Sequence, residues 1–554
     1  MADLHLLTVA QMREVERRAD ASGFSYAQMM QNAGRNAARL ILERLARRLA
    51  SAGPSTAMRV LVLCGPGNNG GDGLVCADEL AESAGRDGLP ITPQVYLLKP
   101  RSEDDPVFAA IRRRGLFVAD ADNDQRLRVL HQLVTHADVI IDALLGTGVS
   151  RPIDGVLRDM LREVRANRPP WLVALDGVTG MNYDTGALDP AAVPADLTIT
   201  FHAPKRGHYC YPAAGACGEL VVIPIGIAPA EDESEVCLAT DPWVRRRLPA
   251  RRADANKGAH GQALVVGGCS DYSGAPALSA AAAYRVGAGL VTLAVPPAIQ
   301  PVVAAHLREA TYLTTPGSRD SLSIEALPRI RARISEWITS ARERHGLLVG
   351  PGMGQSEPAS DFLAALLAQF ESDGRPARMV LDADGLNLVA KLPDWPARLP
   401  RSTILTPHPG EMARLTGLSV AEVQADRIGC ALRYAAEWGH IVVLKGAHTV
   451  VADPNGTAVV APFANPAMAV AGTGDVLAGA IAGLLAQGLA PFDAAVCGVY
   501  AHAKAGALWR DQQGDAGMLA GDLLPLLPAA LRAIHQAADA ASKVYDSSFE
   551  ESDA

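Results

Sequence analysis

Short runs of consecutive Val, Ile and Leu residues alternate with longer segments of helical periodicity along most of this 554-residue chain. A strand that is apolar at every position must be buried on both faces, which is typical of parallel sheets covered by helices. The alternation therefore predicts an α/β architecture with helices on both faces of each sheet. Because a chain of this length exceeds what one core can bury, we expect two domains.

A change of composition separates two series of strands. Residues 230–249 contain the acidic run AEDESE and then several Arg and Pro residues, so we place the domain boundary near 230–245. We expect domains at 1–235 and 236–545, and a disordered acidic tail at 546–554. The expected strands are 59–64, 94–98, 139–142, 171–176, 195–201, 262–266, 290–295, 347–349, 379–382, 403–405 and 440–444. The expected helices include 26–50, 73–83, 275–286 and 476–487.

The composition of the chain excludes several classes of protein. A formal net charge of −9 argues against a nucleic-acid binder, and no apolar run reaches the length of a membrane span. The eight cysteines show no metal-type spacing and are expected to be buried free thiols in a reducing cytoplasm. We therefore expect a cytoplasmic protein with small-molecule ligands, no nucleic-acid or membrane partner, and self-association into a homo-oligomer.

The turn Gly472-Thr473-Gly474-Asp475 comes directly before a helical run. The first N–H groups of a helix lack intrahelical partners and the helix dipole adds positive charge, so this turn suits a phosphate-like anion. A carboxylate there favours a base that acts on a hydroxyl beside a transferring phosphoryl group. The turn alone is equally compatible with a helix that Asp475 merely caps.

Three predicted strands of the first domain are followed by polar, glycine-containing loops. The first loop holds Asn68, Asn69 and Asp72, and the other two begin with Asp142 and Asp176. Because ligands of parallel sheets bind beyond the carboxyl ends of the strands, these side chains are expected to share one rim. Oxygen ligands to a cation could come from Asn69, Asp142 and Thr179, which leaves Asp176 as an acid/base. For each Asp alone, a capping or turn role is equally compatible.

These motifs, together with Phe201-His-Ala-Pro-Lys-Arg-Gly207, resemble the epimerase domain of NAD(P)H-hydrate repair enzymes over about residues 8–228. The resemblance implies a Rossmann-like α/β/α sandwich that interconverts the R and S hydrates of NAD(P)H. It implies K⁺ at Asn69, Asp142 and Thr179, with Asp176 as the catalytic acid/base. The implied substrate contacts are Asn68, Asn69, Gly70, Gly71, Asp72, Gly146, Thr147, Gly148, Val149, Ser150, Arg151, Pro152 and Asp176.

One loop departs from the family's usual pattern. Where the family usually has Asp-Ile-Pro-Ser-Gly, this chain has Asp176-Gly-Val-Thr-Gly180. Thr179 retains a hydroxyl, but the rigid Ile-Pro pair is absent. We therefore expect a different geometry in the loop that carries Asp176.

Five motifs of the second domain lie at expected strand or helix ends. Two prolines fix the backbone around His408, and Lys445 follows a strand, where its ammonium could meet phosphate as a point charge. A capping histidine and a solvated lysine are the structural alternatives. The motifs, in their order, resemble the ribokinase-like dehydratase domain of the same repair system over about residues 240–535; they are 256–276, 349–354, 381–387, 406–411 and 443–449, followed by the Asp475 turn.

The resemblance of the second domain implies a reaction and a set of contacts. It implies dehydration of the S hydrate with ADP, chosen over ATP, and Mg²⁺, with Asp475 as the base. The implied hydrate contacts are Ala275, Gly352, His408 and Asp475. The implied nucleotide contacts are Lys445, Gly446, Ala447, His448, Thr449 and Gly474.

Two other functions remain open from the sequence. The Gly-Thr-Gly-Asp turn also serves small-molecule kinases that act on vitamin precursors, in which case the first domain would be a non-catalytic binding domain. Relatives of the first domain also occur in mRNA-decapping assemblies, where such a domain would be a scaffold. Retention of Asp72, Asp142 and Asp176 favours an active pocket, and the order of the second-domain motifs favours repair.

Overall fold

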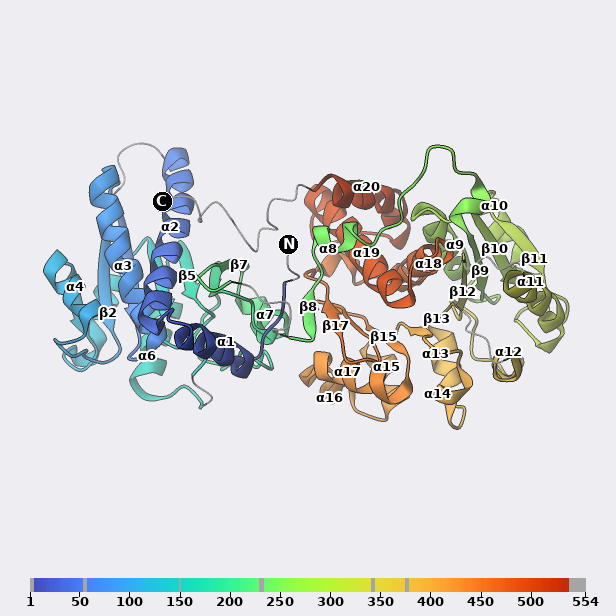
Figure 1. Cartoon of the computed structure of the whole chain (residues 1–554), viewed down its shortest axis with the longest axis horizontal. Helices are drawn as coiled ribbons and strands as arrows, with labels where there is room; N and C mark the ends of the chain where they lie inside the picture. The colour runs from blue at the N-terminus through green and yellow to red at the C-terminus, as the bar shows by residue number, and fades with distance from the viewer. Residues whose placement is uncertain are drawn as a thin grey trace. The chain divides into compact units, whose positions relative to one another are not determined.

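The computed structural model describes residues 4–52, 57–148, 151–228, 234–339, 344–373 and 378–537. The chain divides into two compact units, one ending at Ser234 and the other beginning at Glu235 (Figure 1). Val149, Ser150 and the predicted tail at 546–554 lie outside the described residues. Each unit is an α/β domain, which confirms the predicted fold class.

Seven parallel strands form the sheet of the first unit, in the order β3-β2-β1-β4-β5-β6-β7. The strands are β1 (Met58–Cys64), β2 (Ile91–Leu97), β3 (Phe117–Asp120), β4 (Val139–Ala143), β5 (Trp171–Leu175), β6 (Leu197–Phe201) and β7 (Glu219–Ile223). The helices are α1 (Val9–Ala21), α2 (Tyr26–Ala52), α3 (Asn68–Asp87), α4 (Pro106–Arg114), α5 (Arg128–His136), α6 (Gly155–Ala166) and α7 (Ala213–Ala216).

Alternate residues of β1 contribute to two separate cores, one on each face of this sheet. Val60 and Val62 belong to the core that includes α2 and α3, whereas Leu61 and Leu63 belong to the core that includes α5 and α6. Because both faces are covered, apolar side chains are favoured at successive positions of the central strands. This arrangement explains the continuous Val/Ile/Leu runs of the sequence.

Ten strands form the sheet of the second unit, in the order β11-β10-β9-β12-β13-β14-β15-β16-β17-β8. Six adjacent pairs from β11 to β15 are parallel, whereas β15–β16 and β16–β17 are antiparallel, an end of the sheet that the helix–strand alternation did not predict. The strands are β8 (Val236–Leu238), β9 (Gln262–Val266), β10 (Leu290–Val295), β11 (Thr311–Thr314), β12 (His345–Val349), β13 (Met379–Leu381), β14 (Ile404–Leu405), β15 (Ile441–Leu444), β16 (Val450–Ala452) and β17 (Ala458–Val460).

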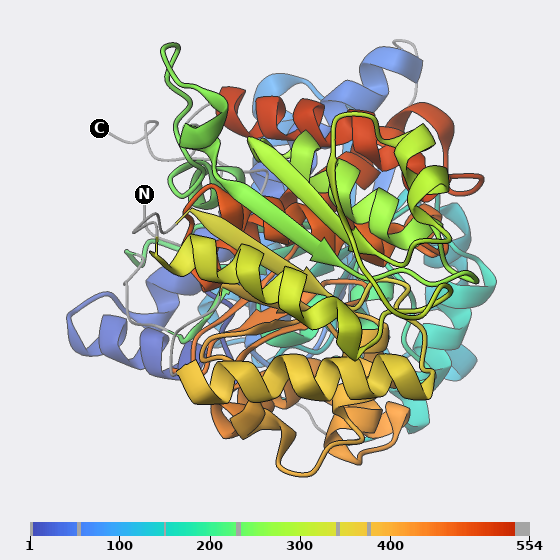
Figure 2. The ribbon, with the colours of Figure 1, turned by 90° about the vertical axis from the view of Figure 1, so that its right-hand side faces the viewer.

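Helices cover both faces of the second sheet, with α18–α20 on one side of the strands and α11 and α12 on the other (Figure 2). The helix α18 is buried from Val476 to Ala486, because it packs between the sheet and the helices α9 and α19. The helices are α8 (Asp241–Arg245), α9 (Gly274–Arg285), α10 (Gln300–His306), α11 (Leu327–Thr339), α12 (Glu357–Asp373), α13 (Asp384–Val389), α14 (Trp395–Arg398), α15 (Pro409–Thr416), α16 (Val420–Ala425), α17 (Arg427–Trp438), α18 (Thr473–Ala486), α19 (Pro491–Gln513) and α20 (Leu523–Gln536).

Two helices begin earlier than the sequence predicted. The helix α3 starts at Asn68, so the segment expected to be a loop from 68 to 72 forms its first turns. Its glycines allow close packing: a Cβ on Gly70 would lie 1.9 Å from the Gly65 carbonyl oxygen, and one on Gly73 would lie 2.6 Å from Ala143 Cβ. The helix α18 starts at Thr473, which places Asp475 inside its first turn.

Close packing of α2 on α3 generates a stability prediction. A Cβ on Gly34 of α2 would lie 2.5 Å from Val75 Cβ, so Gly34→Ala should overpack the contact and lower the free energy of unfolding by about 1–3 kcal/mol. Gly85 of α3 has no heavy atom within 4 Å of that position, so Gly85→Ala should raise it by about 0.5–1 kcal/mol. Denaturant unfolding measures the free energy of unfolding of both variants. Equal changes in Gly34→Ala and Gly85→Ala would contradict the close packing of α2 on α3.

Candidate functional site

Both units place polar side chains at the carboxyl ends of parallel strands. In the first unit Asp142 lies at the end of β4 and Asp176 directly follows β5. In the second unit Asp382 directly follows β13 and Lys445 directly follows β15. The strand order reverses between β1 and β4 in the first sheet and between β9 and β12 in the second. Ligands of open α/β sheets bind at such a reversal. The strands that carry these side chains all lie on the same side of it.

Asp176 is buried in an ion pair with Lys205. The Lys205 Nζ donates to Asp176 Oδ1 at 2.6 Å, and the Thr200 hydroxyl donates to the same oxygen at 3.1 Å. Burial by itself would raise the pKa of Asp176, but the Lys205 ammonium outweighs it and holds that pKa below its ordinary value. Asp176 is therefore ionised at neutral pH and can accept a proton.

The backbone of Asp176 is held in a left-handed conformation, with φ of 63°, which is uncommon for a residue with a side chain. His208 fixes this position. Its Nδ1 accepts from the Lys205 backbone N–H at 3.0 Å, so its Nε2 carries the proton and donates to the Asp176 carbonyl oxygen at 2.9 Å. Burial, with the nearby Lys205 charge, lowers the pKa of His208 to about 4, which keeps the ring neutral.

Two more carboxyl groups act on the same pair through their charges. Asp72 comes from α3 and Glu16 from α1. Burial raises the pKa of each, and the negative charge of Asp176 raises both further, whereas Lys205 opposes the shift. The first site therefore combines an ionised carboxylate with carboxyl groups that hold protons more readily than usual.

Asn69 packs against Gly146, which lies in the loop that follows Asp142, and Asp142 is hydrogen-bonded to Thr179. The Thr179 hydroxyl donates to Asp142 Oδ1 at 2.7 Å, and a Cβ on Gly146 would lie 3.1 Å from Asn69 Cβ. Both polar atoms of the Asn69 side chain are buried and have no hydrogen-bond partner among the described residues. An orphaned buried amide that packs against the loop following Asp142 offers an oxygen of the kind that a cation such as K⁺ binds.

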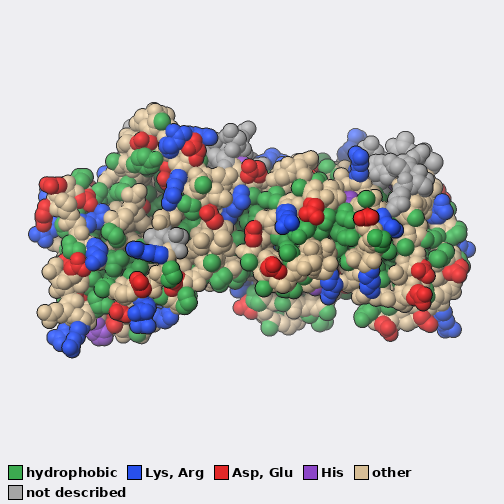
Figure 3. Space-filling model, turned by 90° about the horizontal axis from the view of Figure 1, so that it is seen from below, with side chains coloured by type: hydrophobic (Ala, Val, Ile, Leu, Met, Phe, Trp, Pro, Cys, Tyr) green, Lys and Arg blue, Asp and Glu red, His purple; other side chains and the backbone are tan. Residues whose placement is uncertain are grey.

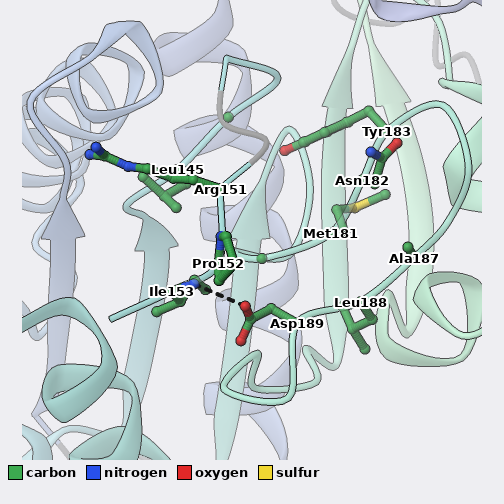
Figure 4. Close-up of a pocket in the computed structure, with 12 residues that line it drawn as sticks. Leu145, Arg151, Pro152, Ile153, Met181, Asn182, Tyr183, Ala187, Leu188 and Asp189 are labelled. Carbon is green, nitrogen blue, oxygen red and sulfur yellow. Dashed lines mark hydrogen bonds between the residues drawn. The ribbon is translucent and has the colours of Figure 1, made fainter. Parts of the chain in front are cut away.

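Next to Gly146, in the loop after β4, a hollow of about 240 Å³ opens in the first unit (Figure 4). From the predicted substrate segment, Gly146, Arg151 and Pro152 line it, and the segment from Gly180 to Asp189 closes its other side. Thr147 and Gly148 belong to the turn that leads toward it. Asn68, Gly70, Gly71 and Asp72 lie in the first turns of α3 instead.

In the second unit Asp475 lies half-buried in the first turn of α18, behind a Gly472 that adopts φ of 92°. The Ser279 hydroxyl donates to the Asp475 backbone carbonyl at 2.9 Å and so ties this turn to α9. No donor in the described part of the chain reaches the Asp475 carboxylate. That carboxylate is therefore available to a ligand.

Lys445 is held by carboxylates close to the same helix start. Its Nζ lies 2.9 Å from Asp382 Oδ1 and 3.6 Å from Glu411 Oε2, and a Cβ on Gly474 would lie 3.4 Å from it. Burial opposes the charge of Lys445, but these carboxylates outweigh burial and raise its pKa. Lys445 is thus a fixed buried cation rather than the solvated lysine considered from the sequence.

The charges around Asp475 make it a base suited to neutral pH. Burial raises the pKa of Asp475 to about 7, the negative charges of Asp382, Asp384 and Glu411 add to the rise, and Lys445 opposes it. A carboxyl group with this pKa is part ionised near pH 7, which is the condition for efficient general-base catalysis. The Asp475 carboxyl group therefore lies within electrostatic reach of the Lys445 cluster.

His408 caps the helix α15. Its Nδ1 accepts from the Gly410 backbone N–H at 3.0 Å, and Glu411 Oε2 accepts from the His408 backbone N–H at 2.8 Å. Burial and the charge of Lys445 lower the pKa of His408, which favours its neutral form. The capping role considered from the sequence is thus present, and a substrate contact for this ring stays a prediction.

Ala275 and Gly352 meet at a neighbouring strand end. A Cβ on Gly352 would lie 2.9 Å from Ala275 Cβ, and the following Gly354 donates its N–H to Asp384 Oδ2 at 2.9 Å. Ala383, between two carboxylates, adopts a strained φ of 51° and ψ of −120°. The predicted hydrate contacts are thus linked, through Asp384, to the charges that act on Asp475.

The predicted nucleotide segment leaves β15 in a tight turn. The Thr449 hydroxyl donates to the Gly446 carbonyl at 2.9 Å, and Arg427 donates to the Leu444 and Lys445 carbonyls. Gly446 and Ala447 are exposed, and His448 adopts φ of 51°. The turn therefore presents backbone groups to solvent beside the Lys445 ammonium.

Sequence reasoning assigned no role to several residues of the two sites. Lys205 lies in the motif at 201–207, Glu411 lies in the motif at 406–411, and Asp382 ends a predicted strand. Their positions at the ends of strands and helices could have indicated a role. Arg101 donates to the Gly65 and Gly67 carbonyls and so holds the turn before α3. Its position in a loop far along the chain gave no such signal.

The described residues add four general observations. All eight cysteines are free. No group of three or more His, Cys, Asp or Glu in the described ranges is arranged to hold a metal ion, and no helix there has the length and apolar content needed to cross a bilayer. On the face drawn in Figure 3, Lys and Arg side chains are interspersed with Asp and Glu.

The fold and the two sites define a two-domain α/β protein with a lysine-paired carboxylate beyond the strand ends of one domain and a carboxylate in the first turn of a glycine-flanked helix in the other. Comparison with known proteins agrees with this class. The chain matches the family described as YjeF-related protein N-terminus over residues 26–207 and the NAD(P)H-hydrate dehydratase family over residues 263–529.

Relatives match both domains at once. The bifunctional NAD(P)H-hydrate repair enzyme of Moorella thermoacetica is 36% identical, over 96% of this chain and 98% of its own. That of Escherichia coli is 35% identical, over 93% and 92%. A Bacillus subtilis ADP/ATP-dependent NAD(P)H-hydrate dehydratase, co-crystallised with ATP/Mg²⁺, is 31% identical over 54% of this chain and 98% of its own, with a TM-score of 0.44. The chain belongs to the bifunctional NAD(P)H-hydrate repair enzymes, which confirms the resemblance seen in its motifs.

The raised pKa of Asp475 has a consequence for stability. Because the folded pKa, about 7, exceeds the value of 3.8 for an unperturbed Asp, the native state binds the proton more tightly than the unfolded state between these pH values. The penalty for ionising Asp475 therefore grows as the pH rises from 4 to 7. Asp475→Asn should raise the free energy of unfolding at pH 8 by about 1–4 kcal/mol and change it little at pH 4.

Denaturant unfolding of the second unit at both pH values measures this effect. Asp361, an exposed carboxyl on α12, is the matched control, because Asp361→Asn should change stability little at either pH. A pH-independent effect of Asp475→Asn would contradict the raised pKa.

Proposed function

We propose that the second domain dehydrates the S hydrate of NAD(P)H with ADP, and that the first domain supplies it by interconverting the R and S hydrates. The observation that carries the proposal is the Asp475 carboxylate, which is free of hydrogen-bond donors in the described chain, lies in the first turn of α18 and has a pKa raised to about 7. A base beside an anion-binding helix start suits phosphorylation of an alcohol.

Hydroxide is a poor leaving group, so the C6 hydroxyl of the hydrated ring must be activated. Asp475 takes the hydroxyl proton while that oxygen attacks the terminal phosphoryl group of ADP, which releases AMP. The N–H groups of Gly472, Thr473 and Gly474 and the Lys445 ammonium stabilise the charge that develops. The ring nitrogen's electrons then expel phosphate as a C5 proton leaves, which gives NAD(P)H.

Nucleotide and metal contacts follow from the same arrangement. The turn from Lys445 to Thr449 and the N–H of Gly474 would bind the nucleotide, with Ala275, Gly352 and His408 toward the hydrate. Mg²⁺ prefers phosphate and carboxylate oxygens, and Asp382, Asp384 and Glu411 are the carboxylates whose charges act on Asp475. The ion would offset phosphate charge when it is bound with ADP.

In the first domain, Asp176 would hold or move the proton at the C6 hydroxyl, because the Lys205 ion pair keeps it ionised. The hollow beside Gly146, Arg151 and Pro152 would receive the hydrate, and the first turn of α3, from Asn68 to Asp72, would add further contacts. K⁺ would be held by Asn69, Asp142 and Thr179, where the buried Asn69 amide lacks a partner within the described chain. Its charge would favour the ionised form of Asp142, whose pKa burial raises.

Removal of the base in the second domain should abolish dehydration. Asp475→Asn should lower kcat for the S hydrate by about 10²–10⁴-fold, because a general base contributes about that factor. ADP binding should remain, since the amide keeps the helix start intact. The assay follows recovery of NAD(P)H absorbance, and a normal rate in this variant would contradict the role of Asp475.

Removal of the acid/base in the first domain should affect one epimer only. Asp176→Asn should leave the R hydrate at its spontaneous rate of conversion while the S hydrate is dehydrated normally. A mixture of both hydrates with excess ADP then gives a fast phase and a slow residual phase of absorbance recovery. Equal loss on both epimers would argue against two separate sites.

A further inference from the structure

Tyr183 carries a buried hydroxyl that the reaction described above does not use. Its side chain is 4% exposed, and its phenol oxygen has no hydrogen-bond partner among the described residues. A buried hydroxyl without a partner destabilises a fold unless a ligand or a water satisfies it. The position of the Tyr183 hydroxyl decides whether a ligand or a water is the expected partner.

The Tyr183 side chain lines the hollow of the first unit, directly beside the catalytic loop. Figure 4 shows the phenol oxygen directed from the Tyr183 segment toward the side of the hollow that carries Leu145 and Arg151. The ring packs edge-on against His208, with centroids 5.6 Å apart, and His208 in turn donates to the Asp176 carbonyl. Tyr183 is thus built into the support of Asp176.

Gly177 makes room for this ring. A Cβ at position 177 would lie 2.7 Å from Tyr183 Cε1, from the Tyr183 hydroxyl and from Met181 Sδ. Any side chain at 177 would therefore displace the phenol. This contact accounts for glycine where the family usually has isoleucine: in this chain Tyr183 and Met181 fill that space and bring a hydroxyl to it.

We propose that Tyr183 is a substrate-positioning residue of the epimerase site, whose hydroxyl donates a hydrogen bond to an oxygen of the hydrated nicotinamide ring. The inference rests on the epimerase function proposed above. Burial, with the negative charges of Asp176 and Asp142, raises the pKa of Tyr183, so the phenol stays protonated and acts as a donor. The donor and the Asp176 carboxylate would then act on the same ring from one loop.

The test is Tyr183→Phe, assayed for conversion of the R hydrate in the full-length enzyme with excess ADP. Loss of a neutral hydrogen bond to the substrate should raise KM about three- to tenfold with little change in kcat. The melting temperature should not fall, because the variant removes an unsatisfied polar group. An unchanged KM, or a lower melting temperature with unchanged KM, would overturn the proposal.

Tyr96→Phe is the matched control. Tyr96 is fully buried in the same unit, and its hydroxyl donates to Asp124 Oδ2 at 3.0 Å. Its loss should lower the melting temperature and leave the KM for the R hydrate unchanged, the opposite of the pattern expected for Tyr183→Phe.

A double-mutant cycle with Gly177→Ala tests the packing that places the hydroxyl. Gly177→Ala should raise KM by itself, and adding Tyr183→Phe should raise it no further, because the hydroxyl has already been displaced. Additive effects would contradict the proposal. If the wild-type enzyme fails to convert the R hydrate above its spontaneous rate, the epimerase function itself fails; if it converts the hydrate and Tyr183→Phe behaves identically, only the role of Tyr183 fails.

Discussion

A buried ammonium that is neutralised by two neighbouring carboxylates governs the second site. Lys445 contacts Asp382 and Glu411 directly, so its positive charge is largely offset before it can act on Asp475. Burial then decides the pKa of Asp475 and raises it to about 7. The same ammonium lies beside the helix start, where phosphate charge would develop. One cation thus leaves the base reactive near neutral pH and still adds positive potential to an anion site.

In the first site a lysine lowers the pKa of the carboxyl group instead. Lys205 contacts Asp176 itself, and this direct ion pair outweighs burial and keeps the carboxylate ionised. For both Asp176 and Asp475, burial raises the pKa and a nearby lysine lowers it. The pKa falls where the lysine contacts the carboxylate itself, and rises where the lysine contacts other carboxylates. A resting ionised base suits reversible proton transfer at a hydroxyl group, whereas a base that titrates near pH 7 suits removal of a proton as phosphoryl transfer proceeds.

Much of the arrangement of the two sites was predictable, because parallel sheets carry their functional side chains at the carboxyl ends of the strands. Continuous apolar runs predicted the central strands of both units, and the strand-end rule placed Asp142, Asp176 and Lys445 at the ends of their strands. The edge strand β3 and the short strand β16, which pairs with β15 and β17, were not predicted, because runs of three or four residues give little periodicity. The glycines before Asp72 were interpreted as a loop, whereas they permit the first turns of α3 to pack closely. The Tyr183 ring packs where a side chain at position 177 would lie. These two residues are six positions apart in a loop, so no pattern of periodicity or charge predicts the contact.

In the proposed reaction the hydroxyl of the hydrate leaves as phosphate. Labelling of the C6 hydroxyl of the S hydrate with ¹⁸O, followed by mass spectrometry of the products of complete turnover with ADP, measures where that oxygen goes. We expect the label in the released inorganic phosphate, one atom per NAD(P)H formed, with none in AMP. Label recovered in water, with unlabelled phosphate, would show that the hydroxyl departs without being phosphorylated.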